Sequence, residues 1–212
     1  MKRIGLLCLA LVLALGTLGV GYAMWSDEVT IEGTVDTGTL RLGIFHAVVE
    51  RIEQGGGVTQ EKDVATVDLS FEGEILEKEF AGFGERMAYE KLKVALNNTF
   101  PCLTVDIAFY LGAVGTIPLH ITAVNISDPS GELIFKRTSL PGSSPIVGYF
   151  YHAGGDPDEE IINVVVGGLP IGQQMHWCDW YKADLILHVK QPAKQNYEYT
   201  FEVKVIGEQW AE

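Results

Sequence analysis

Apolar and polar residues alternate along most of the chain, which is the period expected of strands that bury one face. The clearest runs are residues 67–71, 92–96, 103–111, 185–189 and 199–205. Short stretches rich in Gly, Pro, Asp and Ser separate these runs, as turns do in antiparallel sheets. No long helical stripe competes with this pattern, although Glu74 to Phe80 could form a short helix. We therefore predict an all-β fold, an antiparallel two-sheet sandwich of the jelly-roll type.

The first 23 residues have the three parts of a secretory signal peptide. Lys2 and Arg3 form a basic start, residues 4–20 form an apolar core, and a small-x-small motif ends at Ala23. Cleavage is therefore expected between Ala23 and Met24, which predicts a secreted protein that meets the membrane only before cleavage. The alternative is an uncut anchor, because the apolar run is near the lower limit for spanning a bilayer.

A strand pattern begins almost directly after this cleavage site. The large apolar residues of the segment 24–36 are Trp25, Val29, Ile31 and Val35, and Gly33 lies among them. A mature chain that begins as strand, without a loose tail, indicates that its N-terminus is a working part. We predict three regions: a signal peptide (1–23), an N-terminal strand (24–36) and a β-domain (37–212).

Removal of the leader makes an acidic chain more acidic. The sequence has 15 Lys and Arg against 28 Asp and Glu, and loss of Lys2 and Arg3 changes the formal charge from −13 to −15. Such an excess of negative charge repels phosphate backbones, which argues against nucleic-acid binding.

Two cysteines remain after cleavage, Cys102 and Cys178. In the oxidising compartments that secreted proteins enter, such a pair predicts one disulfide. The alternative is two buried free thiols, since sequence alone does not show whether the Cα atoms approach each other. Neither cysteine has the CxxC partner that a metal site would use.

The sequence carries no recognisable catalytic, metal-binding or cofactor-binding motif. Its five histidines stand singly, without the HExxH spacing of a helical zinc site, and there is no GxSxG or P-loop. Glu159 and Glu160 lie in an acidic loop, 156–160, that reads as a solvated turn or alternatively as a calcium site. We therefore expect no enzyme activity and no cofactor.

Aromatic residues near Cys178 support a different class of function. Trp177, Trp180 and Tyr181 could form a platform on which sugar rings stack, although aromatic residues near a disulfide more often serve packing. The alternative function is thus a secreted carbohydrate-binding β-sandwich module. Asn97 and Asn125 begin N-x-S/T sequons and are the candidate N-glycosylation sites of a surface protein.

Both ends and the middle of the chain resemble one known family. The leader that ends at Ala23 and passes into Trp25-Ser26-Asp27 and Gly38-Thr39-Leu40 resembles the start of TasA/camelysin proteins. The last strand, closing with Gln209-Trp210, is similar to theirs. Phe100-Pro101 and the Gly-Thr-Ile-Pro turn at 115–118 resemble the archaeal branch, which forms bundling pili.

This resemblance implies a secreted jelly-roll subunit that forms extracellular filaments, either biofilm-matrix fibres or pili that bundle laterally. It also implies that the N-terminal segment of one subunit adds as a strand to the sheet of the next, by donor-strand complementation. Trp25, Val29, Ile31, Gly33 and Val35 would then face the acceptor subunit. The competing interpretation is an ordinary first strand within its own domain. The metalloprotease activity described for part of the family is not expected here, because the chain lacks a zinc motif.

Overall fold

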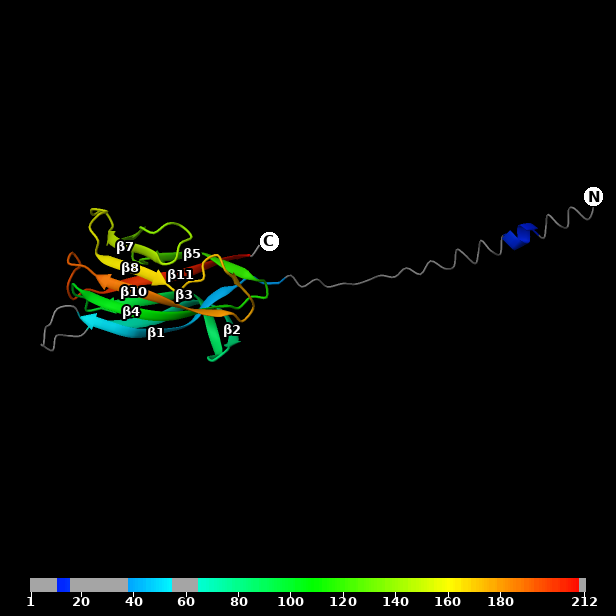
Figure 1. Ribbon diagram of the computed structural model, residues 1–212, viewed down its shortest axis with the longest axis horizontal. Coiled ribbons are helices and arrows are strands. Elements are labelled where there is room, and N and C mark those ends of the chain that lie inside the picture. Colours follow the sequence, from blue (N-terminus) through cyan, green and yellow to red (C-terminus); the bar gives the residue numbers. More distant parts are fainter. Residues whose placement is uncertain (1–10, 16–37, 55–64, 210–212) are drawn as a thin grey trace, which may run out of the picture. The chain divides into compact units, whose positions relative to one another are not determined.

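The computed structural model describes residues 11–15, 38–54 and 65–209 (Figure 1). The last two ranges contain eleven β-strands. The strands are β1 (Leu42–Gln54), β2 (Thr66–Phe80), β3 (Gly84–Asn97), β4 (Leu103–Ala113), β5 (Leu119–Ser127), β6 (Leu133–Arg137), β7 (Ile146–His152), β8 (Ile162–Gly167), β9 (Gln174–Met175), β10 (Trp180–Val189) and β11 (Tyr199–Gln209). Contacts divide the chain into two units, Met1–Thr37 and Gly38–Glu212, and every strand belongs to the second. Residues 11–15 are helical, and none of the described helical residues belongs to a helix long and apolar enough to cross a membrane.

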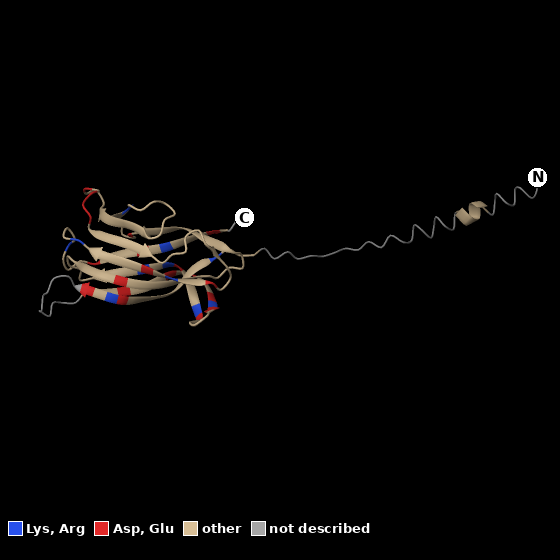
Figure 2. Ribbon diagram, viewed as in Figure 1, with Lys and Arg blue, Asp and Glu red and all other residues tan. Residues whose placement is uncertain are grey.

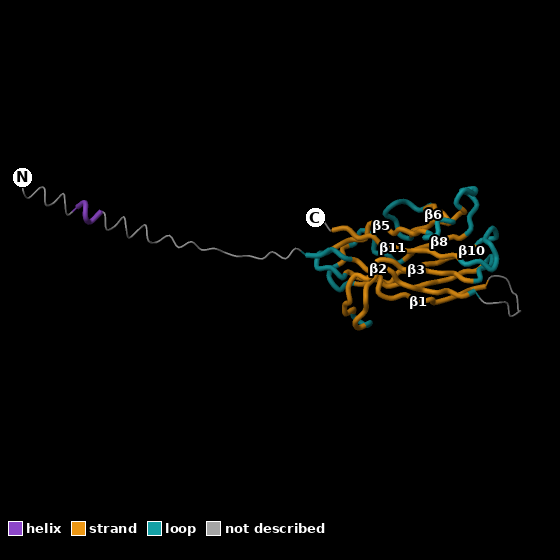
Figure 3. Tube along the Cα trace, turned by 180° about the vertical axis from the view of Figure 1, so that it is seen from behind, coloured by secondary structure: helices purple, strands orange, loops and turns teal. Residues whose placement is uncertain are grey.

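The strands form one antiparallel sheet, which confirms the prediction of an all-β fold. Its order is β6-β7-β8-β10-β4-β1-β3-β11-β5-β9, with β2 paired to β3 outside that path. All five predicted strand runs fall within strands of this sheet. Loops gather at the two ends of the strand body (Figure 3).

The sheet curls so that its two halves share one core. Phe150 of β7 stacks on Phe201 of β11 at 4.7 Å between ring centroids, although five strands separate β7 from β11 in the sheet order. The curl occurs at β1, which pairs with β4 along its length but with β3 at only one position, Ile44 opposite Tyr89. Side chains from both halves therefore meet inside.

Strand alternation fills this core. On β3, Leu92, Val94 and Leu96 are fully buried, while the residues between them point outward. β4 lies in the middle of its half and is buried almost throughout, including Ala108 and Phe109 in succession. A central strand of this kind needs cover on both faces.

The outer cover comes from the hairpin of β2 and β3. The short helix that the sequence allowed at Glu74 to Phe80 is not formed. β2 instead continues as strand to Phe80, which pairs with Gly84, and a register shift lies between Glu74 and Leu76. The neighbouring apolar residues around this irregularity resembled a helical stripe in the sequence. Figure 1 shows this end of the β2 hairpin projecting from the other strands.

A second, smaller cluster anchors the projecting hairpin, which we call the arm. Phe80 at its tip stacks on Phe45 of β1, with ring centroids 3.9 Å apart. Ala88 and Val114 complete the buried part of this cluster. The arm therefore attaches to the outside of the sheet through aromatic packing rather than through strand pairing alone.

The ring of Phe80 packs directly on Gly112, and replacing this glycine tests how much the contact stabilises the arm. A Cβ at Gly112 would lie 2.3 Å from Cε1 of Phe80, too close for any real contact. We expect Gly112→Ala to displace the ring and to lower the free energy of unfolding by about 1–3 kcal/mol, measured by urea denaturation. Gly167→Ala is the matched control, because a Cβ at this strand glycine meets no heavy atom within 4 Å. Equal effects of the two changes would refute the packing role of Gly112.

Candidate assembly interface

The chain enters the sheet through a fixed backbone clamp at residues 39–41. The Ile117 N–H donates to the Thr39 carbonyl at 3.1 Å, and the N–H groups of Val114 and Gly115 both donate to the Arg41 carbonyl. A Cβ at Gly115 would lie 2.1 Å from the Thr39 oxygen, so only glycine fits there. The clamp fixes the backbone of Thr39 and Arg41 just before β1.

The residues of the predicted cleavage site and donor strand, Ala23, Met24, Trp25, Val29, Ile31, Gly33 and Val35, lie outside the described residues. Their assignment stays a prediction. What the structure does describe is the surface that could receive such a strand.

Among the described strands, β1 and β2 have the longest open edges, while the short strands β6 and β9 at the two ends of the sheet order are also paired on one side only. Beyond Ile44, β1 pairs only with β4, and β2 pairs only with β3 along its whole length. The outer edges of both strands therefore present N–H and C=O groups without a partner strand in the described part of the chain. Open edges of this length are ready templates for another strand.

Apolar side chains that are only half-buried accompany these edges. They pack against the margin of the main core and are Ala47, Val49 and Ile52 of β1 and Val67, Leu69 and Phe71 of β2. Core-facing residues of neighbouring strands, such as Leu92 of β3 and Val105 of β4, are fully buried. The six side chains remain partly exposed because no described strand covers this side of the core. We call these six residues and their two strand edges the open margin.

A cleft of about 510 Å³ lies where the sheet forks. Its walls include Leu42 of β1, Ile75 of β2 and Val205 to Gly207 of β11. Pairing between β11 and β3 stops at Lys204, opposite Lys91, so the backbone of β11 beyond this point is free of β3. The cleft therefore adds a shorter open edge on the other side of the contact between β1 and β3.

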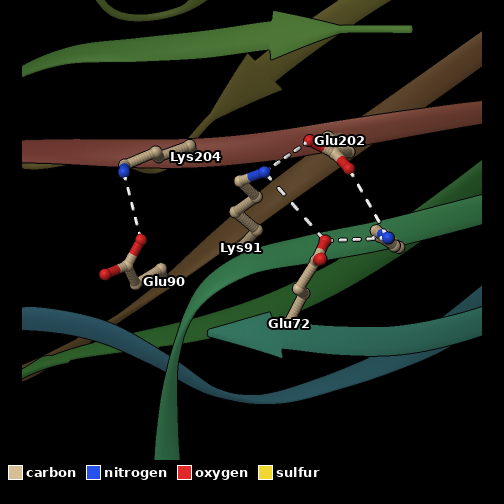
Figure 4. A network of polar contacts seen from close by, with 6 residues as sticks. Glu72, Glu90, Lys91, Glu202 and Lys204 are labelled. Atoms are coloured by element: carbon tan, nitrogen blue, oxygen red, sulfur yellow. Dashed lines mark hydrogen bonds and ion pairs between the residues drawn. The ribbon is translucent and has the colours of Figure 1, made fainter. Parts of the chain in front are cut away.

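Lys, Arg, Asp and Glu residues are scattered along several of the strands (Figure 2). On β2, β3 and β11 they form a ladder (Figure 4): Lys93 binds Glu72 at 2.7 Å, and Lys91 binds Glu202 at 2.9 Å. The hydrogen bond from Lys93 lowers the pKa of Glu72 below its usual value, and the hydrogen bond to Glu202 raises the pKa of Lys91. The ladder ties the edge strand β2 to the rest of its half.

The predicted disulfide between Cys102 and Cys178 is wrong. Both cysteines are free and half-exposed. The Cys102 N–H donates to the Val189 carbonyl and the Cys178 N–H to the Ala113 carbonyl, which places the two thiols at opposite ends of the β4–β10 pair. Across the 11 residues of β4 this separation is about 35 Å, far beyond the reach of a disulfide.

The aromatic residues near Cys178 do not form one platform. Trp180 packs into the small cluster beside Tyr110 and Phe83, whereas Tyr181 packs against the main core. Neighbouring residues of a strand point to opposite faces, which explains the separation. Trp177 is 60% exposed, and the Lys78 ammonium lies 4.0 Å from its ring centroid.

The candidate glycosylation sites differ in their surroundings. Asn125 is exposed on β5. Asn97 is half-buried and its amide donates to Asp68 at 2.7 Å, while Thr99 of the same sequon is fully buried.

The acidic loop is held by protein contacts. Lys136 binds Asp158 at 2.9 Å, and hydrogen bonding with Tyr149 and, to a smaller extent, with Asp158 raises the pKa of Lys136. Glu159 is exposed and Glu160 half-buried. Within the residues described, no group of three or more His, Cys, Asp or Glu side chains is arranged to hold a metal ion.

Comparison with known proteins adds no relative: no family model, no curated protein and no solved structure gives a significant match.

Replacement of Glu72 tests the charged ladder. Because the Glu72 pKa is lowered in the folded protein, its stabilising effect is present above the unfolded-state pKa and is lost as the pH falls through the folded-state pKa. We expect Glu72→Gln to lower the thermal unfolding midpoint at pH 7 by at most about 4 °C, and to have no effect near pH ~2. Glu77→Gln is the control, since Glu77 is exposed on the same strand and makes no ion pair with any described residue. A Glu72 effect that persists at the acidic pH would contradict the ladder's role.

Proposed function

We propose that the chain is the structural subunit of an extracellular filament, a pilus or a biofilm-matrix fibre, that grows head to tail from identical subunits. After signal cleavage, segment 24–36 of one subunit adds as a strand to the open margin of the next. The open margin is the observation that carries this proposal. Half-buried apolar side chains beside unpaired backbone are what strand addition requires, since main-chain bonds give affinity and alternate side chains give fit.

The segment is long enough for the margin and matches its pattern. Thirteen extended residues span about 43 Å, more than the ten residues of β1 that follow Ile44 (45–54). Val29, Ile31 and Val35 are spaced so that their side chains would point to one face of an extended strand. Packed on Val49 and Leu69, they would complete the cover that the core lacks on this side.

We also infer that the curled sheet is a two-layered jelly roll. One layer would hold β6, β7, β8, β10, β4 and β1, and the other β3, β11, β5, β9 and β2. The single pair between Ile44 and Tyr89, where β1 meets β3, supports a division at that point. In this architecture the open margin is the side on which the two layers are not joined by a described strand.

No observation favours the carbohydrate-binding alternative. Its platform would have needed Trp177, Trp180 and Tyr181 on one surface, whereas Trp180 and Tyr181 serve two separate clusters. We therefore keep the filament as the single proposed function.

Removal of the donor segment is the first test. We expect chain 24–212 to form unbranched fibres above a critical concentration, visible by negative-stain microscopy, and chain 37–212 to remain monomeric. A synthetic peptide of residues 24–36 should bind chain 37–212 with one-to-one stoichiometry by calorimetry, since the peptide supplies the missing strand. Fibres from chain 37–212, or no fibres from chain 24–212 at high concentration, would refute the proposal.

Point changes on the margin are the second test. Leu69→Lys places a charge where the donor would pack, so we expect the critical concentration to rise by about ten-fold or more. Ser70→Lys is the matched control, because Ser70 is the next residue of β2 and is exposed. Val49→Lys and Val48→Lys form the same comparison on β1, where Val48 is 42% exposed.

Circular dichroism of the monomers must show that each lysine variant folds. Impaired polymerisation by Ser70→Lys and Val48→Lys, with Leu69→Lys and Val49→Lys unaffected, would place the interface on the outward face instead.

A further inference from the structure

The side chains of Glu160, Asn163 and Lys190 form a continuous chain of polar contacts on the outward side of the sheet. The Asn163 amide is oriented by its hydrogen-bond network. Its nitrogen donates to Glu160 Oε2 at 3.0 Å, and its oxygen accepts from Lys190 Nζ at 3.3 Å. An amine and a carboxylate therefore lie at the two ends of one amide group, instead of binding each other directly.

The backbone fixes the three residues relative to one another. Asn163 of β8 lies opposite His188 of β10, and Lys190 directly follows β10, where its N–H donates to the Ile161 carbonyl at 2.7 Å. Residues that are diagonal in this way across two strands lie about 7–8 Å apart, which a lysine side chain spans easily. The two residues between Glu160 and Asn163 are both fully buried, so the alternation is interrupted and both polar side chains lie on one side.

The loop that carries the carboxylate is held against the sheet. Tyr149 of β7, which pairs with Asn163, donates from its hydroxyl to the Pro157 carbonyl at 2.9 Å, and Lys136 binds Asp158 at 2.9 Å. Tyr149 is only 7% exposed, and all three members of the polar chain are half-buried. Water therefore competes only in part for their contacts, and neighbouring segments maintain their arrangement.

We propose that Lys190 and Asn163 join in an isopeptide bond, with Glu160 as the group that transfers the proton. The nitrogen of the neutral Lys190 amine attacks Cγ of Asn163, so that a new C–N bond forms and the original C–N bond of the amide breaks. The proton that the attacking nitrogen loses passes to the Glu160 carboxylate and then to the departing nitrogen, which leaves as ammonia. The step balances without an oxidant or a cofactor. Fixed proximity supplies the advantage that an amine in solution lacks.

The bond would hold two neighbouring strands together where their backbone pairing ends. That pairing stops at Ile162 of β8 opposite Val189 of β10. A covalent link just beyond this pair keeps the strands joined when their hydrogen bonds open, and it restricts the unfolded chain as a disulfide does. The bond forms within one subunit, so the inference does not depend on filament assembly.

The test is the mass of purified chain 24–212, measured by mass spectrometry in denaturant. We expect the mass to lie below that of the sequence by one ammonia, and a digest to contain a peptide in which Lys190 is cross-linked to Asn163. Lys190→Arg should restore the full mass because it removes the nucleophilic amine, and Glu160→Gln should do so because it removes the proton acceptor.

Lys182→Arg and Glu159→Gln are the matched controls, and both should keep the lower mass. Lys182 lies on β10 and pairs with Glu50, while Glu159 is the exposed neighbour of Glu160. Circular dichroism must show that each variant folds.

Three results would contradict the proposal. Full mass of the unaltered chain would show that the three groups form hydrogen bonds only, and would overturn the bond while leaving the proposed function intact. Loss of ammonia without a cross-linked peptide would place the change at another amide and would also overturn it. A cross-link that survives Glu160→Gln would overturn the role of that carboxylate.

Discussion

The structure depends on how the backbone hydrogen bonds of one strand are satisfied. β1 is bonded to β4 along its whole length, but its other edge meets β3 only at Ile44. Every strand beyond this point belongs to the second half of the curled sheet, so the shared core exists because β1 turns away from β3. The same divergence leaves the edge of β1 beyond Ile44 without a partner in the described chain. The outer edge of β2 is open for a different reason, because β2 is the last strand on the opposite edge of β3.

The arm packs against the sheet at one end of the open margin. β2 and β3 continue past their contact with β1, and the aromatic ring of Phe80 packs against Phe45 and Gly112. The arm therefore covers apolar surface that a central strand such as β4 would otherwise expose. It lies at the end of the margin where β1 meets β3.

The alternation of apolar and polar residues was enough to predict the strands, but it did not predict which strands pair with one another. The alternation of Val67, Leu69 and Phe71 identifies a half-buried strand whether its edge is paired or open. Edge status depends on which strands come together, and no local pattern encodes it. The short helix that Glu74 to Phe80 could have formed is absent for a similar reason, because pairing with β3 outweighs the local preference of this segment. The disulfide failed because the sequence separation of two cysteines does not reveal that they cap opposite ends of one strand pair.

The strands of the open margin carry both charged side chains that favour contact with water and apolar side chains that favour burial. The ladder from Glu72 to Glu202 places charge on the outward face of β2, β3 and β11, which keeps that face hydrated. On β2 these charges alternate with the apolar residues of the margin, so the strand has one charged face and one apolar face beside its unpaired edge. A net negative chain resists random association, and only a partner that supplies both backbone hydrogen bonds and apolar side chains gains enough to overcome this repulsion. An extended apolar strand meets both requirements, which is why we propose the margin, rather than any charged surface, as the place where identical subunits join.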